Sequence, residues 1–228
     1  MKLERIKHGF NFVAPYYDLF SYLLFQGRLL HAQTHYFDRI GKVDSILIFG
    51  GGTGKILPPL FKTIEFNSLT YIDISGNMLK KARRNCEAYE SDHVTKIEFI
   101  EGSTEVLNKN QQFNLIITPF VLDCFSDENL LKVITKLDEH LEPGGTWLFT
   151  DFNEDQDFGI ISDMRSAFIK SLYFVFNLFC PLGITKLPRF GGAFSQLNYS
   201  TVAQTQMLHG LVVGRVYQKL ASPDREYQ

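Results

Sequence analysis

The chain of 228 residues is predicted to form one α/β domain with a doubly wound, mostly parallel seven-stranded sheet, a C-terminal antiparallel hairpin and helical lid elements. Three observations predict this fold. Short apolar runs alternate with amphipathic segments from residue 45 onward, which is typical of repeated βαβ units. A glycine-rich turn directly follows the first run. The last part of the chain favours two strands, about 197–207 and 211–220, joined by a tight turn.

Five apolar runs are the predicted strands of the parallel part. They lack polar alternation, as expected where helices cover both faces of a sheet. The runs are 46–49, 69–72, 97–100, 115–118 and 146–149. Crossover helices are predicted to begin at the capping candidates Ser75 and Ser126. Glu-Pro-Gly-Gly at 142–145 is predicted to stop the second helix and turn into the fifth strand.

Two helical segments lie outside a minimal doubly wound sheet. One is aromatic, at about 15–40, and the other is apolar, at about 160–179. Together they are predicted to form a lid over the ligand cleft. The predicted organisation is a single domain with an N-terminal helical lid at 1–43, a binding core at 44–152, an apolar helical insertion at 153–190, and a hairpin and tail at 191–228.

The charge and the cysteine content argue against nucleic-acid binding, a disulfide framework and a metal site. A formal charge of −2 and a pI near 6.3 give no net attraction to phosphate backbones, so we expect no nucleic-acid partner. The three cysteines lack CxxC spacing, which predicts neither a disulfide framework nor a metal site and favours a cytoplasmic location. The most hydrophobic run falls short of the roughly 20 residues that span a bilayer, so no integral membrane segment is expected.

The turn 50–54, Gly-Gly-Gly-Thr-Gly, follows a strand where a doubly wound fold brings backbone close to a nucleotide-like ligand. About twenty residues later the second strand ends at Asp73, whose carboxylate can accept hydrogen bonds from ribose hydroxyls. The pattern is GxGxG, since Lys55 replaces the last glycine of a dinucleotide turn, and Ile56 replaces the Ser or Thr of a phosphate-binding loop. The alternative is a tight turn with Asp73 as a helix cap.

At these residues the sequence resembles the class I S-adenosylmethionine-dependent methyltransferases, whose first motif is a strand with GxGxG and whose second is an acidic strand end. Residues 100–103 resemble the family's third strand end, 113–118 its fourth strand, and 141–149 its L-x-P-G-G start of strand five. The resemblance covers about 46–152, with a weaker hairpin match to about residue 220. It implies a Rossmann-like fold and S-adenosylmethionine as the cofactor.

The resemblance also implies a set of cofactor-binding residues. The glycines would face the methionine portion, Asp73 would hold the ribose, and Ile74 with Met78 would flank the adenine. Ser103 would lie near the adenine amino group, and Thr118 ends the strand that leads to the methyl donor. The implied set is Gly50, Gly52, Gly54, Asp73, Ile74, Met78, Ser103 and Thr118.

Two positions depart from the family pattern. Phe49 stands where the family usually has an acidic residue before the first glycine, and Ser103 stands where it often has Asp. A protein that binds the cofactor without methylating therefore remains an alternative. A nicotinamide-dependent oxidoreductase on a related fold is a second alternative.

Asp123, after the fourth strand, is the first candidate for a base or an acceptor-orienting group, with a pKa raised by its apolar neighbours. The alternative is that Asp123 caps the start of a helix.

The segment 12–20 resembles the A-x-x-Y-D start of ubiquinone and menaquinone biosynthesis methyltransferases. This resemblance implies that Tyr17 and Asp18 lie over the cofactor. The alternative for Tyr17 is that it only packs the helix onto the domain. His8 and His209 are second-line candidates.

The acceptor's polarity is suggested by the apolar segment 160–179, whose Phe, Leu and Tyr residues surround their helix. A helix with one buried face does not need apolar residues on all sides. A lipophilic pocket or a protein partner would account for the surplus, so the hypothesis is a small, partly apolar acceptor. A homodimer through the Phe-rich helices is compatible with it. Because S-adenosylmethionine carries an activated methyl group, such an enzyme must chiefly align the acceptor and exclude water.

Overall fold

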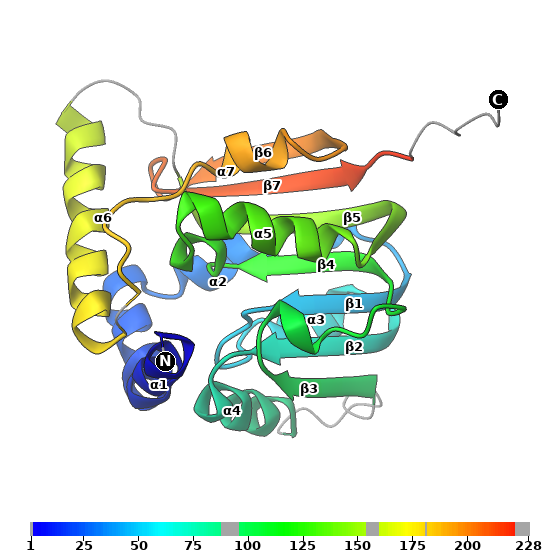
Figure 1. Cartoon of the computed structure of the whole chain (residues 1–228), viewed down its shortest axis with the longest axis horizontal. Helices are drawn as coiled ribbons and strands as arrows, with labels where there is room; N and C mark the ends of the chain where they lie inside the picture. Colours follow the sequence, from blue (N-terminus) through cyan, green and yellow to red (C-terminus); the bar gives the residue numbers. More distant parts are fainter. Residues whose placement is uncertain (1, 88–95, 154–159, 181, 222–228) are drawn as a thin grey trace.

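A computed structural model of the chain describes residues 2–87, 96–153, 160–180 and 182–221. Its sheet has seven strands in the order β3-β2-β1-β4-β5-β7-β6, which confirms the predicted fold class (Figure 1). β1 to β5 are parallel, and β7 runs antiparallel to both β5 and β6. The strands are β1 (Val43–Phe49), β2 (Phe66–Asp73), β3 (Ile97–Glu101), β4 (Phe113–Pro119), β5 (Leu141–Phe152), β6 (Tyr199–Met207) and β7 (Val212–Lys219).

Helices cover both faces of the sheet, and alternate residues of each strand supply the two cores. On one face, Ile46 and Ile48 of β1 pack with α3 (Leu57–Thr63) and α4 (Gly76–Glu87). On the other face, Leu47 and Phe49 pack with α5 (Asp127–Asp138) and α7 (Phe190–Phe194). Both faces of these strands are therefore buried, which explains why the predicted strands carry no polar alternation.

Ser75 caps α4 as predicted, because its Oγ accepts a hydrogen bond from the backbone N–H of Met78 at 3.1 Å. Ser126 is the N-cap residue of α5 but makes no such side-chain bond. The role predicted for 142–145 was wrong. α5 ends at Asp138, and the Glu-Pro-Gly-Gly segment lies inside β5, where the pairing with β4 shifts register. Pro143 has no backbone N–H, so a bulge accommodates it.

The aromatic segment differs from its predicted single helix at 15–40. α1 spans Lys2–Phe25, and Gln26 and Gly27 with positive φ separate it from α2 (Arg28–Thr34). Pro15 lies inside α1. Proline cannot donate to the carbonyl four residues earlier, and that carbonyl, of Asn11, accepts a bond from Asn77 Nδ2 at 3.0 Å instead.

The apolar segment forms α6 (Ile160–Phe179), with the predicted bounds. α1 and α6 lie at the end of the molecule toward which the parallel strands point (Figure 1). They pack together through one cluster that includes Phe10 and Val13 of α1 and Ile169 and Tyr173 of α6. Among the described residues, no helix is long and apolar enough to cross a membrane.

Candidate functional site

A cavity of about 460 Å³ opens at the carboxyl ends of β1, β2 and β4, beneath α1. The strand order reverses at β1, between β2 and β4, and this is the point where doubly wound sheets bind their ligands. Seven of the predicted site residues line this cavity. They are Tyr17, Gly50, Gly52, Asp73, Ile74, Met78 and Ser103.

The glycine turn lies at one wall of the cavity. Gly50 and Gly52 have φ of +71° and +63°, which favour glycine. No described atom lies within 4 Å of where a Cβ at Gly52 would stand, so the cavity reaches the bare backbone. Gly54 instead faces α4, where a Cβ would lie 2.7 Å from the Cα of Ala82. Gly54 therefore brings α4 close to the turn and does not line the cavity.

Asp73 joins the two predicted motifs. Its Oδ2 accepts the N–H of Gly52 and its Oδ1 accepts the N–H of Ser75, both at 2.9 Å. Burial raises the pKa of this carboxyl to about 6, although the two backbone N–H groups act in the opposite direction. Each carboxylate oxygen has a further lone pair, so Asp73 can still accept hydrogen bonds from a ligand in the cavity.

The remaining predicted cofactor residue is Thr118, near the end of β4. It is fully buried, its Oγ accepts a hydrogen bond from Trp147 Nε1 at 3.0 Å, and it does not line the cavity. Phe49, the departure from the family pattern, does line the cavity and makes that wall apolar.

α1 is fastened over the cavity by Asn11, which the sequence analysis missed. Asn11 Oδ1 accepts hydrogen bonds from Ser75 Oγ at 2.7 Å and from the N–H of Asn77 at 3.1 Å. One amide thus holds α1 to the start of α4, directly after Asp73. An amide between two phenylalanines, Phe10 and Phe12, was the available signal.

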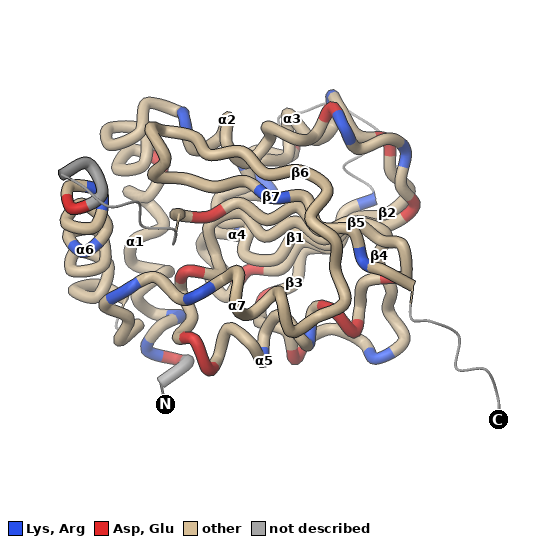
Figure 2. Tube along the Cα trace, turned by 90° about the horizontal axis from the view of Figure 1, so that it is seen from above, with Lys and Arg blue, Asp and Glu red and all other residues tan. Residues whose placement is uncertain are grey.

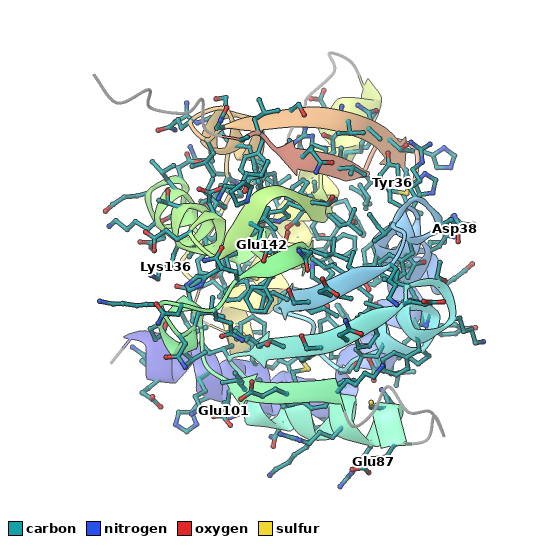
Figure 3. The ribbon with its side chains drawn as sticks, turned by 90° about the vertical axis from the view of Figure 1, so that its right-hand side faces the viewer. Tyr36, Asp38, Glu87, Glu101, Lys136 and Glu142 are labelled. Carbon is teal, nitrogen blue, oxygen red and sulfur yellow. The ribbon has the colours of Figure 1, made fainter. Side chains whose placement is uncertain are left out.

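Asp18 fastens α1 at a second point, on the glycine turn. Its Oδ1 accepts a hydrogen bond from Thr53 Oγ1 at 2.7 Å, and Lys55 and Lys81 each lie 3.6 Å from its carboxylate. A third contact, between Lys7 and Glu101 at 2.5 Å, ties α1 to the end of β3; Figure 3 labels Glu101 there. Asp18 therefore orders the lid and does not face the cavity.

A second cavity, of about 70 Å³, adjoins the first beneath α1 and α6, and Asp123 lines it. Both cavities share the same five lining residues, Phe10, Tyr17, Phe120, Cys124 and Leu182. Burial raises the pKa of the Asp123 carboxyl to about 6, which confirms the predicted effect of its apolar neighbours. Burial also raises the pKa of Tyr17.

Two further residues hold Asp123, and the sequence analysis found neither role. Asp151 is fully buried and accepts the backbone N–H groups of Leu122, Asp123 and Phe152 at 2.8–3.2 Å. Tyr173 of α6 donates its hydroxyl to Asp123 Oδ2 at 3.4 Å. Burial and the neighbouring Asp123 charge raise the pKa of Asp151. The three backbone N–H groups act in the opposite direction and stabilise the ionised form of Asp151.

His8 and His209 are exposed and line neither cavity. Among the residues that the structure describes, no cluster of three or more His, Cys, Asp or Glu side chains is placed to hold a metal ion. The polar side chains that line the two cavities carry carboxyl, hydroxyl, thiol, amide and ammonium groups, the last two from Asn129 and Lys132.

Comparison with known proteins agrees with this geometry. Residues 47–147 match the family model described as a methyltransferase domain. This segment, 101 of the 228 residues, is thus similar to methyltransferase domains. The matched segment contains the glycine turn, Asp73 and Asp123. The similarity favours S-adenosylmethionine over a nicotinamide dinucleotide as the ligand of the turn.

Two curated relatives of the chain are malonyl-[acyl-carrier protein] O-methyltransferases. The one from Ilyobacter polytropus is 23% identical over 163 residues, and the one from Priestia megaterium is 27% identical over 170 residues. Each alignment covers 72% of the chain, but only 60% and 56% of the respective relatives. The chain thus spans less than two thirds of their length.

Solved structures share the fold of the chain. DhpI in complex with S-adenosylhomocysteine has a TM-score of 0.68 at 14% identity, covering 97% of the chain and 98% of DhpI. The N-methyltransferase NodS from Bradyrhizobium japonicum, in complex with S-adenosylhomocysteine, has a TM-score of 0.58 at 15% identity, covering 84% of each chain. The lining of the cavity fits the cofactor that the sequence resemblance implies, because Gly52 leaves open space beside a buried carboxylate that is already oriented.

Proposed function

We propose that the protein transfers the methyl group of S-adenosylmethionine to an oxygen atom of a small, partly apolar acceptor. One observation carries the proposal: the cavity at the glycine turn adjoins a narrow, mostly apolar cavity that reaches the buried carboxyl of Asp123. A pocket with few polar groups selects an apolar molecule and orients it by those groups.

In this proposal the larger cavity holds the cofactor. The bare backbone of Gly50 and Gly52 accommodates the methionine portion, Asp73 accepts the ribose hydroxyls, and Ile74, Met78 and Ser103 surround the adenine. When bound, the cofactor supplies a methyl group activated on a sulfonium. Gly54 and Thr118 act through packing, behind the residues that line the cavity.

The chain's own residues orient the acceptor and hold its proton. Tyr17 and Phe120 line both cavities and position the acceptor between them. Asp123 accepts the proton of an acceptor hydroxyl. With a pKa of about 6, its carboxyl is largely ionised at neutral pH and is a stronger base than an ordinary aspartate. α1 and α6 cover this region and exclude water, and good alignment can supply roughly 7 to 11 kcal/mol of the barrier.

Oxygen as the acceptor atom is supported by the names of the two curated relatives, both O-methyltransferases. Those names also give malonyl-[acyl-carrier protein] as what these relatives methylate. The apolar lining around Asp123 favours a small hydroxylated aromatic or lipid-like molecule for this chain. We infer no nucleic-acid substrate, since the chain carries a net charge of −2.

The test is methyl transfer from radiolabelled S-adenosylmethionine to a panel of phenols, quinone precursors, hydroxylated lipids and malonyl-[acyl-carrier protein]. We expect labelled product that extracts into organic solvent. Label found only in the carrier protein, in nucleic acid or in other proteins would overturn the proposed acceptor class. Tight binding of S-adenosylhomocysteine without transfer to any acceptor would instead favour the cofactor-binding alternative, which Phe49 in the cavity wall motivates.

A further inference from the structure

The N-terminal helix α1 is apolar on two sides. Its inner side, with Phe10, Val13 and Tyr17, packs on α6 or lines the cavities. Its outer side carries a stripe at helical spacing whose members are 60–67% exposed: Phe12, Tyr16, Leu19 and Leu23. No described part of the chain covers this stripe. Large exposed apolar patches mark sites that bind a partner or a membrane.

The lid helix α6 continues the same surface. Phe174 and Leu178, one turn apart on its outer side, are 74% and 71% exposed. Phe12 of α1 stacks on Phe179 of α6 with ring centroids 5.7 Å apart, so the two stripes join. We call these residues of α1 and α6 together the lid face. In Figure 2 the tubes of α1 and α6 are mostly tan, with few charged positions.

The lid face also continues into the acceptor cavity. Phe20 and Leu24 of α1 are both exposed and line the cavity that contains Asp123, as does Phe176 of α6. An apolar molecule can therefore pass between the outside and Asp123 along apolar side chains. A protein partner seated on this face would cover Phe20 and Leu24.

The charges at the lid face favour an anionic occupant. Exposed Lys170 lies one turn before Phe174, and exposed Arg28 follows the end of α1. Asp18 is the one carboxylate within 10–28, and it is turned inward onto Thr53; 164–179 contains none. A twofold pairing of two copies needs a self-complementary surface, but the exposed carboxylates of the two helices, Glu4 and Asp163, lie in their first turns, outside the lid face. Exposed Tyr16 and Tyr22 suit the boundary between headgroups and acyl chains.

We propose that the lid face docks on the surface of an anionic lipid bilayer. The apolar side chains enter the headgroup boundary, and Lys170 and Arg28 pair with acidic headgroups. The docked orientation places the opening at Phe20 and Leu24 against the lipid, so that a lipophilic acceptor reaches Asp123 without crossing water. This last step rests on the proposed function, whereas the docking itself does not. A homodimer through the same helices, which the sequence also suggested, is the rival occupant.

The test is flotation of the whole chain with vesicles of phosphatidylcholine alone and of phosphatidylcholine mixed with phosphatidylglycerol. We expect the protein to float with the mixed vesicles. The double variant F174E/L178E should bind them at least about tenfold less, because two apolar anchors are lost and two negative charges are added. The matched control V202E, at an exposed apolar residue of β6, should bind as the parent does. K170E should lose about fivefold or more, on the mixed vesicles only.

A second double variant, Y16E/L23E, tests the same face from α1, so that misfolding of one variant does not decide the result. The thermal unfolding midpoint and the binding of S-adenosylhomocysteine by calorimetry report folding in every variant. A parent protein that stays unbound with both vesicle types would overturn the proposal. So would a dimer in light scattering that F174E/L178E dissociates, without vesicle binding. Vesicle binding without methyl transfer would refute the proposed function and leave the docking intact.

Discussion

The two adjoining cavities differ in which parts of the chain form them. We call the larger cavity, at the glycine turn, the cofactor half, and the smaller cavity, at Asp123, the acceptor half. The cofactor half centres on the backbone of the glycine turn, which the carboxylate of Asp73 joins to the backbone N–H of Ser75. The acceptor half is made of side chains from segments far apart, with Tyr17 on α1, Asp123 after β4 and Tyr173 on α6. Changes in the first half should therefore affect binding of the cofactor, and changes in the second should affect turnover.

Each half contains a buried carboxyl whose pKa burial raises to about 6, but different donors hold the two carboxyls. Asp73 has backbone N–H donors on both oxygens. Asp123 has the weaker thiol and hydroxyl donors of Cys124 and Tyr173. Asp73 is thus suited to hold a ligand in place, and Asp123 is suited to exchange a proton.

The largest expected effect is that of D123N on turnover. The amide cannot accept the acceptor's proton, so we expect kcat/KM to fall by about 10²- to 10³-fold while S-adenosylhomocysteine binds as before. Steady-state kinetics and calorimetry measure the two quantities. D38N, at an exposed carboxyl on the 3-10 helix after α2, is the control and should leave both unchanged. Equal losses of binding and turnover in D123N would contradict the division into two halves.

The second prediction concerns G52A in the cofactor half. A methyl group there points into the cavity, so we expect affinity for S-adenosylhomocysteine to fall by at least about a hundredfold. G144A is the matched control, because Gly144 also has a positive φ with open space at its Cβ, but lies in β5 away from the cavity. Both variants should lose roughly 1–2 kcal/mol of stability from the backbone strain. Similar affinities in the two would show that the turn does not touch the cofactor.

The third prediction is a pH dependence of cofactor binding. Ribose hydroxyls donate to the ionised form of Asp73, whose pKa is raised to about 6. Binding therefore favours deprotonation, so affinity should be level above that pKa and fall up to about tenfold per pH unit below it. Calorimetry with S-adenosylhomocysteine from about pH 5 to about pH 8 measures the slope. D73N should bind more weakly and lose the slope; a slope that persists in D73N would assign it to another group.

The smallest expected effect is that of Y173F in the acceptor half. The Tyr173 hydroxyl lowers the pKa of Asp123 by donating to it, so its loss should raise that pKa. The acid limb of the pH profile of kcat/KM should then move to higher pH, with a loss of about threefold near neutral pH. Y199F removes a similar hydroxyl that donates to Asp138 at 2.6 Å, outside both cavities, and should not move the profile. A parallel shift in Y199F would point to a general effect on stability.

The sequence by itself determined the sheet, its glycine turn and the helix α6. Strand cores, a positive-φ turn and a strand-end carboxylate depend on neighbouring residues, so local patterns predict them. The same local logic failed at Pro15 and at 142–145, where proline and glycine normally mark boundaries. In the structure a hydrogen bond from Asn77 and a bulge in β5 satisfy the backbone there.

Only the tertiary structure decided which side chains surround Asp123 and what holds α1 in place. Tyr173 and Asp123 are 50 residues apart in the chain, and Asn11 and Ser75 are 64 apart. Burial raises the pKa values of the carboxyls and strengthens these hydrogen bonds. These groups become buried only when distant helices pack over the ends of the strands. No local spacing encodes that packing.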